Sequence, residues 1–129
     1  MSIDNNTVAQ SIDALAAVEN LLMDPRDLLA DTVFLTLAFP GTAEYQAAVV
    51  NTVKALKNLV SKNVSASMLS GTFEGWESYH YQPKVGQGIP ADMRIIFKRE
   101  GDSVRVLAFG HRYIPTDLYG RVSTLRSAQ

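Results

Sequence analysis

The chain contains no cysteine among its 129 residues. This excludes a disulfide framework, cysteine zinc sites, iron–sulfur clusters and a thiol nucleophile, and it fits a reducing compartment. Long hydrophobic runs are also missing, since the longest covers residues 33–39, far short of the ~20 apolar residues that cross a membrane. The first residues show no basic segment followed by an apolar stretch, so we expect no signal peptide. We therefore expect a cytoplasmic protein with no membrane partner.

The chain has little net charge, −1 in total, but its charge is unevenly distributed. Residues 1–31 carry six acids and one base, whereas residues 84–129 carry eight bases and four acids. Six of those eight bases are arginine, whose guanidinium group pairs bidentately with phosphate and carboxylate groups. The C-terminal part therefore favours a phosphate-bearing or acidic partner, the alternative being an ordinary solvated surface.

Hydrophobic periodicity predicts helices and strands in alternating groups. We expect helices at 7–23, 43–62 and 118–126, and strands at 33–39, 73–81, 92–99 and 103–110. This order indicates an α+β domain, in which a small, mainly antiparallel sheet has helices packed on one face. We expect residues 32–129 to form this domain and residues 1–31 to form an acidic, helical N-terminal extension.

The last two strands are separated by a turn at Gly101, which predicts their pairing. In the simplest register, Arg94 faces Phe109 and Phe97 faces Val106. Arg94 and His111 then lie on the same face of the sheet. Arg112 joins them only if the strand breaks at Gly110, and we expect such a break.

The C-terminal half resembles the toxins of the RelE/ParE superfamily, in particular their RelE/YoeB-like branch. The resemblance is carried by residues 91–98, with an arginine before aliphatic residues, and by residues 104–112, which end in Gly-His-Arg, followed by Tyr119. Residues 69–71 and 76–81 are similar to the leucine–glycine turn and second strand of that branch. In all, the resemblance covers about residues 32–126.

The resemblance implies the toxin component of a type II toxin–antitoxin module. Such a protein cuts messenger RNA on the ribosome, where the 2′-hydroxyl of a nucleotide attacks the adjacent phosphate, and a cognate antitoxin silences it. No cofactor is implied. The alternative is a non-catalytic protein of the same fold, either a gyrase-inhibiting ParE-type toxin or a decayed toxin that acts as a protein-binding module.

Cleavage by a 2′-hydroxyl requires a base, a cation over the phosphate and an acid for the leaving oxygen. The candidate catalytic residues are Arg94, Arg112, His111, Glu77, His80 and Tyr119. The candidate RNA-binding residues are Lys84, Lys98, Arg105 and Arg121. Two histidines 31 positions apart do not form a metal motif, so we expect no metal.

Each of the main candidates also has a structural alternative. Arg94 would pair with Glu77 across neighbouring strands. His111 would cap a turn or lie satisfied in the core, and Tyr119 would only fasten the C-terminal segment to the sheet. The acidic N-terminal helix would pack on the domain as structure, occupy the surface that an antitoxin helix uses, or remain a disordered arm.

Overall fold

The computed structural model describes residues 3–61 and 64–126. A five-stranded sheet with the order β1-β5-β4-β3-β2 is parallel only between β1 and β5. The elements are α1 (Asn5–Ala16), β1 (Leu21–Leu22), α2 (Pro25–Ala38), α3 (Thr42–Ser61), β2 (Ser67–Met68), the 3-10 helix η1 (Gly71–Phe73), β3 (Glu77–Tyr81), β4 (Met93–Glu100), β5 (Ser103–His111) and α4 (Leu118–Leu125). The predicted α+β class with a mostly antiparallel sheet is confirmed.

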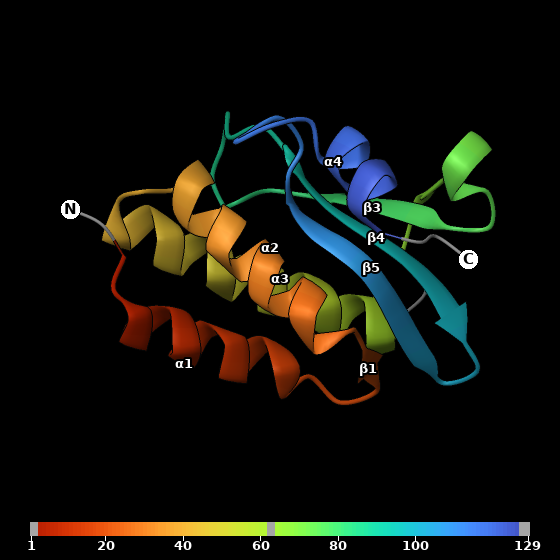
Figure 1. The fold of residues 1–129 in the computed structure, drawn as a ribbon, viewed down its shortest axis with the longest axis horizontal. Helices are drawn as coiled ribbons and strands as arrows, with labels where there is room; N and C mark the ends of the chain where they lie inside the picture. The colour runs from red at the N-terminus through yellow and green to blue at the C-terminus, as the bar shows by residue number, and fades with distance from the viewer. Residues whose placement is uncertain (1–2, 62–63, 127–129) are drawn as a thin grey trace.

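Two apolar clusters hold helices on the two faces of the sheet (Figure 1). The larger cluster joins α1, α2 and α3 to one face, where Leu15, Leu35 and Leu56 meet Ile95 and Phe97. The smaller one joins α4 to the other face, where its Leu118 and Val122 pack on Ile96, Leu107 and Ala108, with Phe73 and Trp76 beside them. The N-terminal helix α1 is therefore packed on the domain as part of the structure, which was the first of the three alternatives for it.

The predicted strand at 33–39 is wrong, because these residues form the second half of α2 and its cap. The helix begins where Asp24 accepts a hydrogen bond from the backbone N–H of Arg26 at 2.8 Å, and Pro25 occupies the first turn, a position that suits proline. Its buried residues Leu28, Asp31, Thr32 and Leu35 have helical spacing. A short apolar run does not by itself distinguish a strand from a buried helix. A domain boundary after residue 31 would fall inside this helix.

The predicted helix at 7–23 is too long, since α1 ends at Ala16. Asn20 takes a left-handed conformation (φ 65°), which asparagine tolerates better than most residues, and this turns the chain into the edge strand β1. The strand expected from residue 73 starts only at Glu77, because η1 and a turn at Gly75 (φ 90°) precede it.

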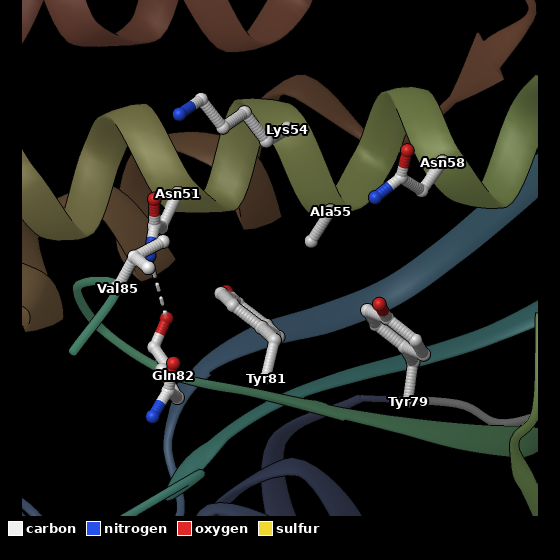
Figure 2. A pocket seen from close by; sticks show the side chains of 8 residues that line it. All are labelled: Asn51, Lys54, Ala55, Asn58, Tyr79, Tyr81, Gln82 and Val85. Carbon is white, nitrogen blue, oxygen red and sulfur yellow. Dashed lines mark hydrogen bonds between the residues drawn. The ribbon is translucent and has the colours of Figure 1, made fainter. Parts of the chain in front are cut away.

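The predicted helix at 43–62 is confirmed as α3, and residue 62 lies outside the described residues. Its buried face, which includes Tyr45, Val49 and Leu59, packs into the core. A hollow of about 200 Å³ remains between α3 and β3, where the small Ala55 faces Tyr79 and Tyr81 (Figure 2). The helix predicted at 118–126 is likewise confirmed, as α4.

The register of β4 and β5 changes partway along the pair. Near the turn Phe97 pairs with Val106, as predicted, but beyond it Ile96 pairs with Ala108, so Leu107 is an extra, bulged residue. The expected break at Gly110 therefore occurs at Leu107. Arg94 consequently faces Gly110, and the prediction that it faces Phe109 is wrong.

Because of the bulge, each β5 side chain after Leu107 lies on the opposite face of the sheet from the one predicted. His111 pairs with the fully buried Met93, so it lies on the α2–α3 side of the sheet. Arg94 lies on the α4 side, because successive side chains alternate along a strand. The prediction that Arg94 and His111 share a face is therefore wrong.

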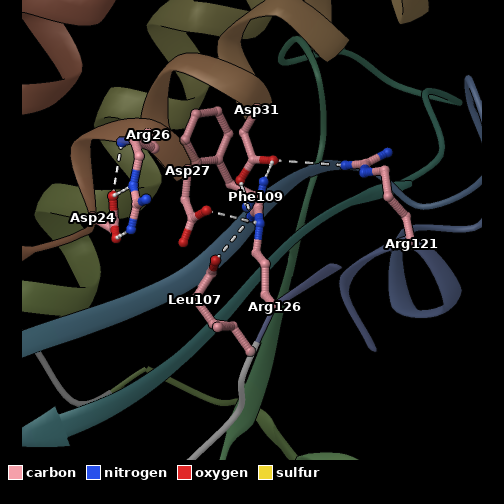
Figure 3. A network of polar contacts seen from close by, with 8 residues as sticks. All are labelled: Asp24, Arg26, Asp27, Asp31, Leu107, Phe109, Arg121 and Arg126. Carbon is pink, nitrogen blue, oxygen red and sulfur yellow. Dashed lines mark hydrogen bonds and ion pairs between the residues drawn. The ribbon is translucent and has the colours of Figure 1, made fainter. Parts of the chain in front are cut away.

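A buried ion pair satisfies the backbone groups at the bulge (Figure 3). The N–H of Phe109 donates to Asp31 Oδ2 at 3.0 Å, and Arg126 Nη1 donates to the carbonyl of Leu107 at 2.9 Å. Arg126 also donates to both carboxylate oxygens of Asp31, at 2.9 Å and 2.7 Å. Asp31 is 0% exposed. This single contact joins α2, β5 and the end of α4.

Two further charges complete the network. Asp27 lies 3.2 Å from Arg126 Nε, and Arg121 lies 3.8 Å from Asp31 with its guanidinium 4.1 Å from the centre of the Phe34 ring. Burial raises the pKa of Asp31 and lowers the pKa of Arg121. Asp31, Arg121 and Arg126 are almost completely buried, whereas the side chain of Asp27 is 28% exposed, so the second acid that offsets the two arginines lies at the edge of the network.

We expect Asp31→Asn to lower the free energy of unfolding by about 3–5 kcal/mol, because it leaves two arginines without their buried counter-charge. Urea denaturation measures this loss, with Asp13→Asn on the exposed side of α1 as the matched control. The double variant Asp31→Leu/Arg126→Met should lose less than the two single changes together. A loss below about 1 kcal/mol in Asp31→Asn, the range of an exposed pair, would contradict a stabilising role for the network.

Candidate functional site

The α4-facing side of β3, β4 and β5 brings together four of the six candidate catalytic residues. His80 pairs with Arg94, and Arg94 pairs with Gly110, so the three positions form one row across the sheet. Arg112 follows two positions after Gly110, where its backbone N–H continues the pairing by donating to the carbonyl of Asp92 at 2.7 Å. Tyr119 reaches the same face from α4.

Arg112 and Tyr119 are linked directly. The guanidinium of Arg112 lies 4.5 Å from the centre of the Tyr119 ring, within cation–π range, and forms an ion pair with Asp117. The Tyr119 hydroxyl shares a hydrogen bond of 2.6 Å with Ser78 Oγ. Tyr119 therefore fastens α4 to β3 and at the same time positions Arg112.

His80 stands beside these cations with an exposed side chain. Partial burial lowers its pKa, and the positive charges of Arg94 and Arg112 lower it further. The imidazole is therefore neutral at pH 7 and can accept a proton. A polar hollow of about 180 Å³, formed with Ser78 and residues 65–67, lies next to it.

Arg94 is oriented by the backbone of its own segment. Its Nη1 donates to the carbonyls of Ala91 and Met93 at 2.6 Å and 3.0 Å. The alternative pairing with Glu77 is not observed, because Glu77 faces Phe97 and lies on the opposite side of the sheet. Within residues 3–61 and 64–126, the other nitrogens of Arg94 make no hydrogen bond, so they are available to a phosphate.

A search of protein-family models, of curated proteins and of solved structures finds no match for this chain.

His111 has a structural position away from this group. Its Nδ1 accepts hydrogen bonds from the backbone N–H groups of Tyr113 and Ile114, both at 3.1 Å, and its ring lies edge-on to Phe39. Its side chain is only 11% exposed. This agrees with the structural alternative, in which His111 caps a turn and has its hydrogen bonds made within the fold.

The four predicted RNA-binding residues do not gather at the site. Arg121 is buried in the Asp31 network, so the prediction that it contacts RNA is wrong. Arg105 is paired with Glu100 at 2.5 Å near the β4–β5 turn, and Lys98 lies 4.7 Å from the centre of the Trp76 ring. Lys84 is exposed in the loop between β3 and β4.

Ser78 and Asp117 contribute to the site but were not predicted from the sequence. Ser78 precedes His80 by two positions, so strand alternation places it on the same face. Asp117 precedes the predicted helix and caps it by accepting a hydrogen bond from the N–H of Gly120 at 3.0 Å. Both positions could have been found from these two patterns.

No group of three or more metal-ligating side chains occurs within the described part of the chain. None of its helices is long and apolar enough to span a bilayer.

The hydrogen bonds of His111 predict that the protein becomes less stable as the pH falls. Burial lowers the pKa of His111. The unfolded chain therefore binds a proton at a higher pH than the folded protein does. The free energy of unfolding should be highest above about pH 6.5, the ordinary pKa of histidine. It should fall as the pH drops toward the lowered pKa of His111 in the folded protein.

Urea denaturation at pH 5.5 and pH 7.5 measures this effect. His111→Asn keeps a hydrogen-bond acceptor but cannot titrate, so it should reduce the difference between the two pH values. His80→Gln, which removes the more exposed histidine, is the comparison. An undiminished difference in His111→Asn would show that its hydrogen bonds do not depend on the neutral ring.

Proposed function

We propose that this protein is an endoribonuclease that cleaves messenger RNA on the ribosome, as the toxin component of a type II toxin–antitoxin module. The observation that carries the proposal is the row of His80 and Arg94 on neighbouring strands, with Arg112 and Tyr119 beside it. A neutral base and two guanidinium groups on one face of the sheet are the parts that attack by a 2′-hydroxyl needs.

Each residue has a role that follows from its surroundings. His80 accepts the proton of the 2′-hydroxyl, which then attacks the adjacent phosphorus and displaces the 5′-oxygen. Arg94 binds the non-bridging oxygens through its free nitrogens and stabilises the charge that develops on them. The Tyr119 hydroxyl, held by Ser78 at 2.6 Å, donates a proton to the leaving oxygen.

The ion pair between Arg112 and Asp117 favours a second candidate function, because an acidic side chain already occupies this guanidinium group. Asp117 takes the place that a phosphate would take, and substrate must displace it before Arg112 can help. A face of this kind, used only for binding, would suit the non-catalytic alternative, a gyrase-inhibiting or protein-binding member of the same fold. Activity measurements separate the two.

An antitoxin requires an apolar surface on which to dock, and α2 offers one. Leu29, Val33 and Leu37 are 50%, 43% and 56% exposed and are spaced four residues apart on one side of the helix. An amphipathic partner helix is recognised by such a stripe.

Primer extension of messenger RNA on programmed ribosomes tests the nuclease function. The full-length protein should produce new RNA ends, and Arg94→Gln should reduce their yield by about 10²–10³-fold, as for other single donors to a developing oxyanion. Arg26→Gln is the matched control, because Arg26 is exposed and, within residues 3–61 and 64–126, its one ion pair is with Asp24. A folded protein that produces no ends would contradict the nuclease and favour the binding protein.

The pH dependence of cleavage should follow the protonation state of His80. Because the pKa of His80 is lowered, kcat/KM should rise with a midpoint below about pH 6.5 and be level at pH 7. Arg112→Gln should move this midpoint upward, since it removes a positive charge that disfavours the imidazolium. An unmoved midpoint in this variant would exclude His80 as the base.

A further inference from the structure

We propose that the hollow between α3 and β3 binds one base of a single-stranded RNA, on the opposite face of the sheet from His80. The hollow is formed by Asn51, Lys54, Ala55 and Asn58 of α3 and by Tyr79 and Tyr81 of β3 (Figure 2). This inference rests on the proposed function, because it names a second contact for the same substrate.

The shape and size of the hollow suit a single planar ring. Its volume of about 200 Å³ is below the ~300–1,000 Å³ typical of sites for whole small molecules. The rings of Tyr79 and Tyr81 are nearly parallel, with an interplanar angle of 15° and centroids 6.0 Å apart. Tyr81 belongs to the buried core, so the partly exposed ring of Tyr79 would be the platform on which an unpaired base stacks.

The polar groups around the hollow have unused hydrogen-bonding capacity. The half-buried Asn58 amide and the Tyr79 hydroxyl make no hydrogen bond with residues 3–61 or 64–126. Figure 2 shows the Asn58 amide on the side of α3 that faces the tyrosines. An amide that both donates and accepts matches the edge of a nucleobase, which presents both kinds of group.

The surroundings favour a ligand that carries negative charge. The described residues that line the hollow include no acid, and the exposed Lys54 lies on the outer side of α3, where Figure 2 shows its amine turned away from the tyrosines. Val85 is 79% exposed at the rim of the hollow, where it would cover a bound ring. A phosphate outside the hollow would lie within reach of Lys54, and a base inside it would bury apolar surface.

Strand alternation connects this hollow with the proposed catalytic face. Tyr79 and Tyr81 point toward α3, whereas His80, between them, points to the other side. Among the described residues, β3 pairs with β2 only at residues 77–78, which leaves the edge at residues 79–81 free. An RNA strand that crosses this free edge would contact His80 on one face and the tyrosines on the other.

NMR titration of the full-length protein, without ribosomes, tests the inference with a single-stranded hexanucleotide RNA and with its component mononucleotides. We expect the hexanucleotide to shift the Asn58 amide and Tyr79 ring signals and to bind more tightly than any mononucleotide. Equal affinities would mean that the hollow binds free nucleotides, and the RNA assignment would be wrong. Shifts confined to His80 and Arg94, or no shifts at all, would also overturn it.

Variants of one residue separate stacking from folding. Tyr79→Leu should weaken hexanucleotide binding about tenfold, and Tyr79→Phe should retain it, because the ring does the stacking. Lys57→Gln, on the same helix but outside this hollow, is the control, and thermal unfolding checks that every variant folds. Equal binding by Tyr79→Leu and the unchanged protein would overturn the inference. Ribosome-dependent cleavage is measured in parallel, so loss of the base site and failure of the nuclease function are distinguishable.

Discussion

Asp31 of α2 and Arg126 at the end of α4 meet in a buried, doubly hydrogen-bonded ion pair beside β5. This ion pair supplies partners for the carbonyl of the bulged residue Leu107 and for the N–H of Phe109, two positions after it in β5. Buried backbone groups without partners are costly, so the bulge and the ion pair stabilise each other. Since Asp31 belongs to α2 and Arg126 follows α4, the same contact joins helices on both faces of the sheet.

The bulge decides which side chains meet. By inserting one residue at Leu107, it moves Gly110 and Arg112 to the face that carries Arg94 and His80, and it moves His111 to the face covered by α2. Without it, His111 would stand beside Arg94 and Arg112 would face the core. The arrangement of the proposed catalytic face is thus a consequence of a polar contact that itself takes no part in the proposed chemistry.

The sequence predicted the fold class, α3, α4 and the β4–β5 hairpin, because their periodicity and turn residues are local. It failed for α2, where a continuous apolar run at 33–39 fits a strand or a buried helix equally well, although Asp24-Pro25 marked a helix start. It also failed for the bulge. That feature depends on Asp31 and Phe109, which are 78 positions apart, and on Arg126, 95 positions from Asp31, so no local pattern indicates it.

We propose that the reactive face of the sheet is the one that carries His80, and not the one that carries His111. Ribosome-dependent cleavage by His80→Gln and by His111→Gln, compared at a pH and temperature where both variants are folded, distinguishes the two faces. We expect His80→Gln to lose activity by about 10²–10⁴-fold, as for the loss of a general base, and His111→Gln to retain it. Loss of activity in His111→Gln with full activity in His80→Gln would mean that the reactive face is the one covered by α2 and α3.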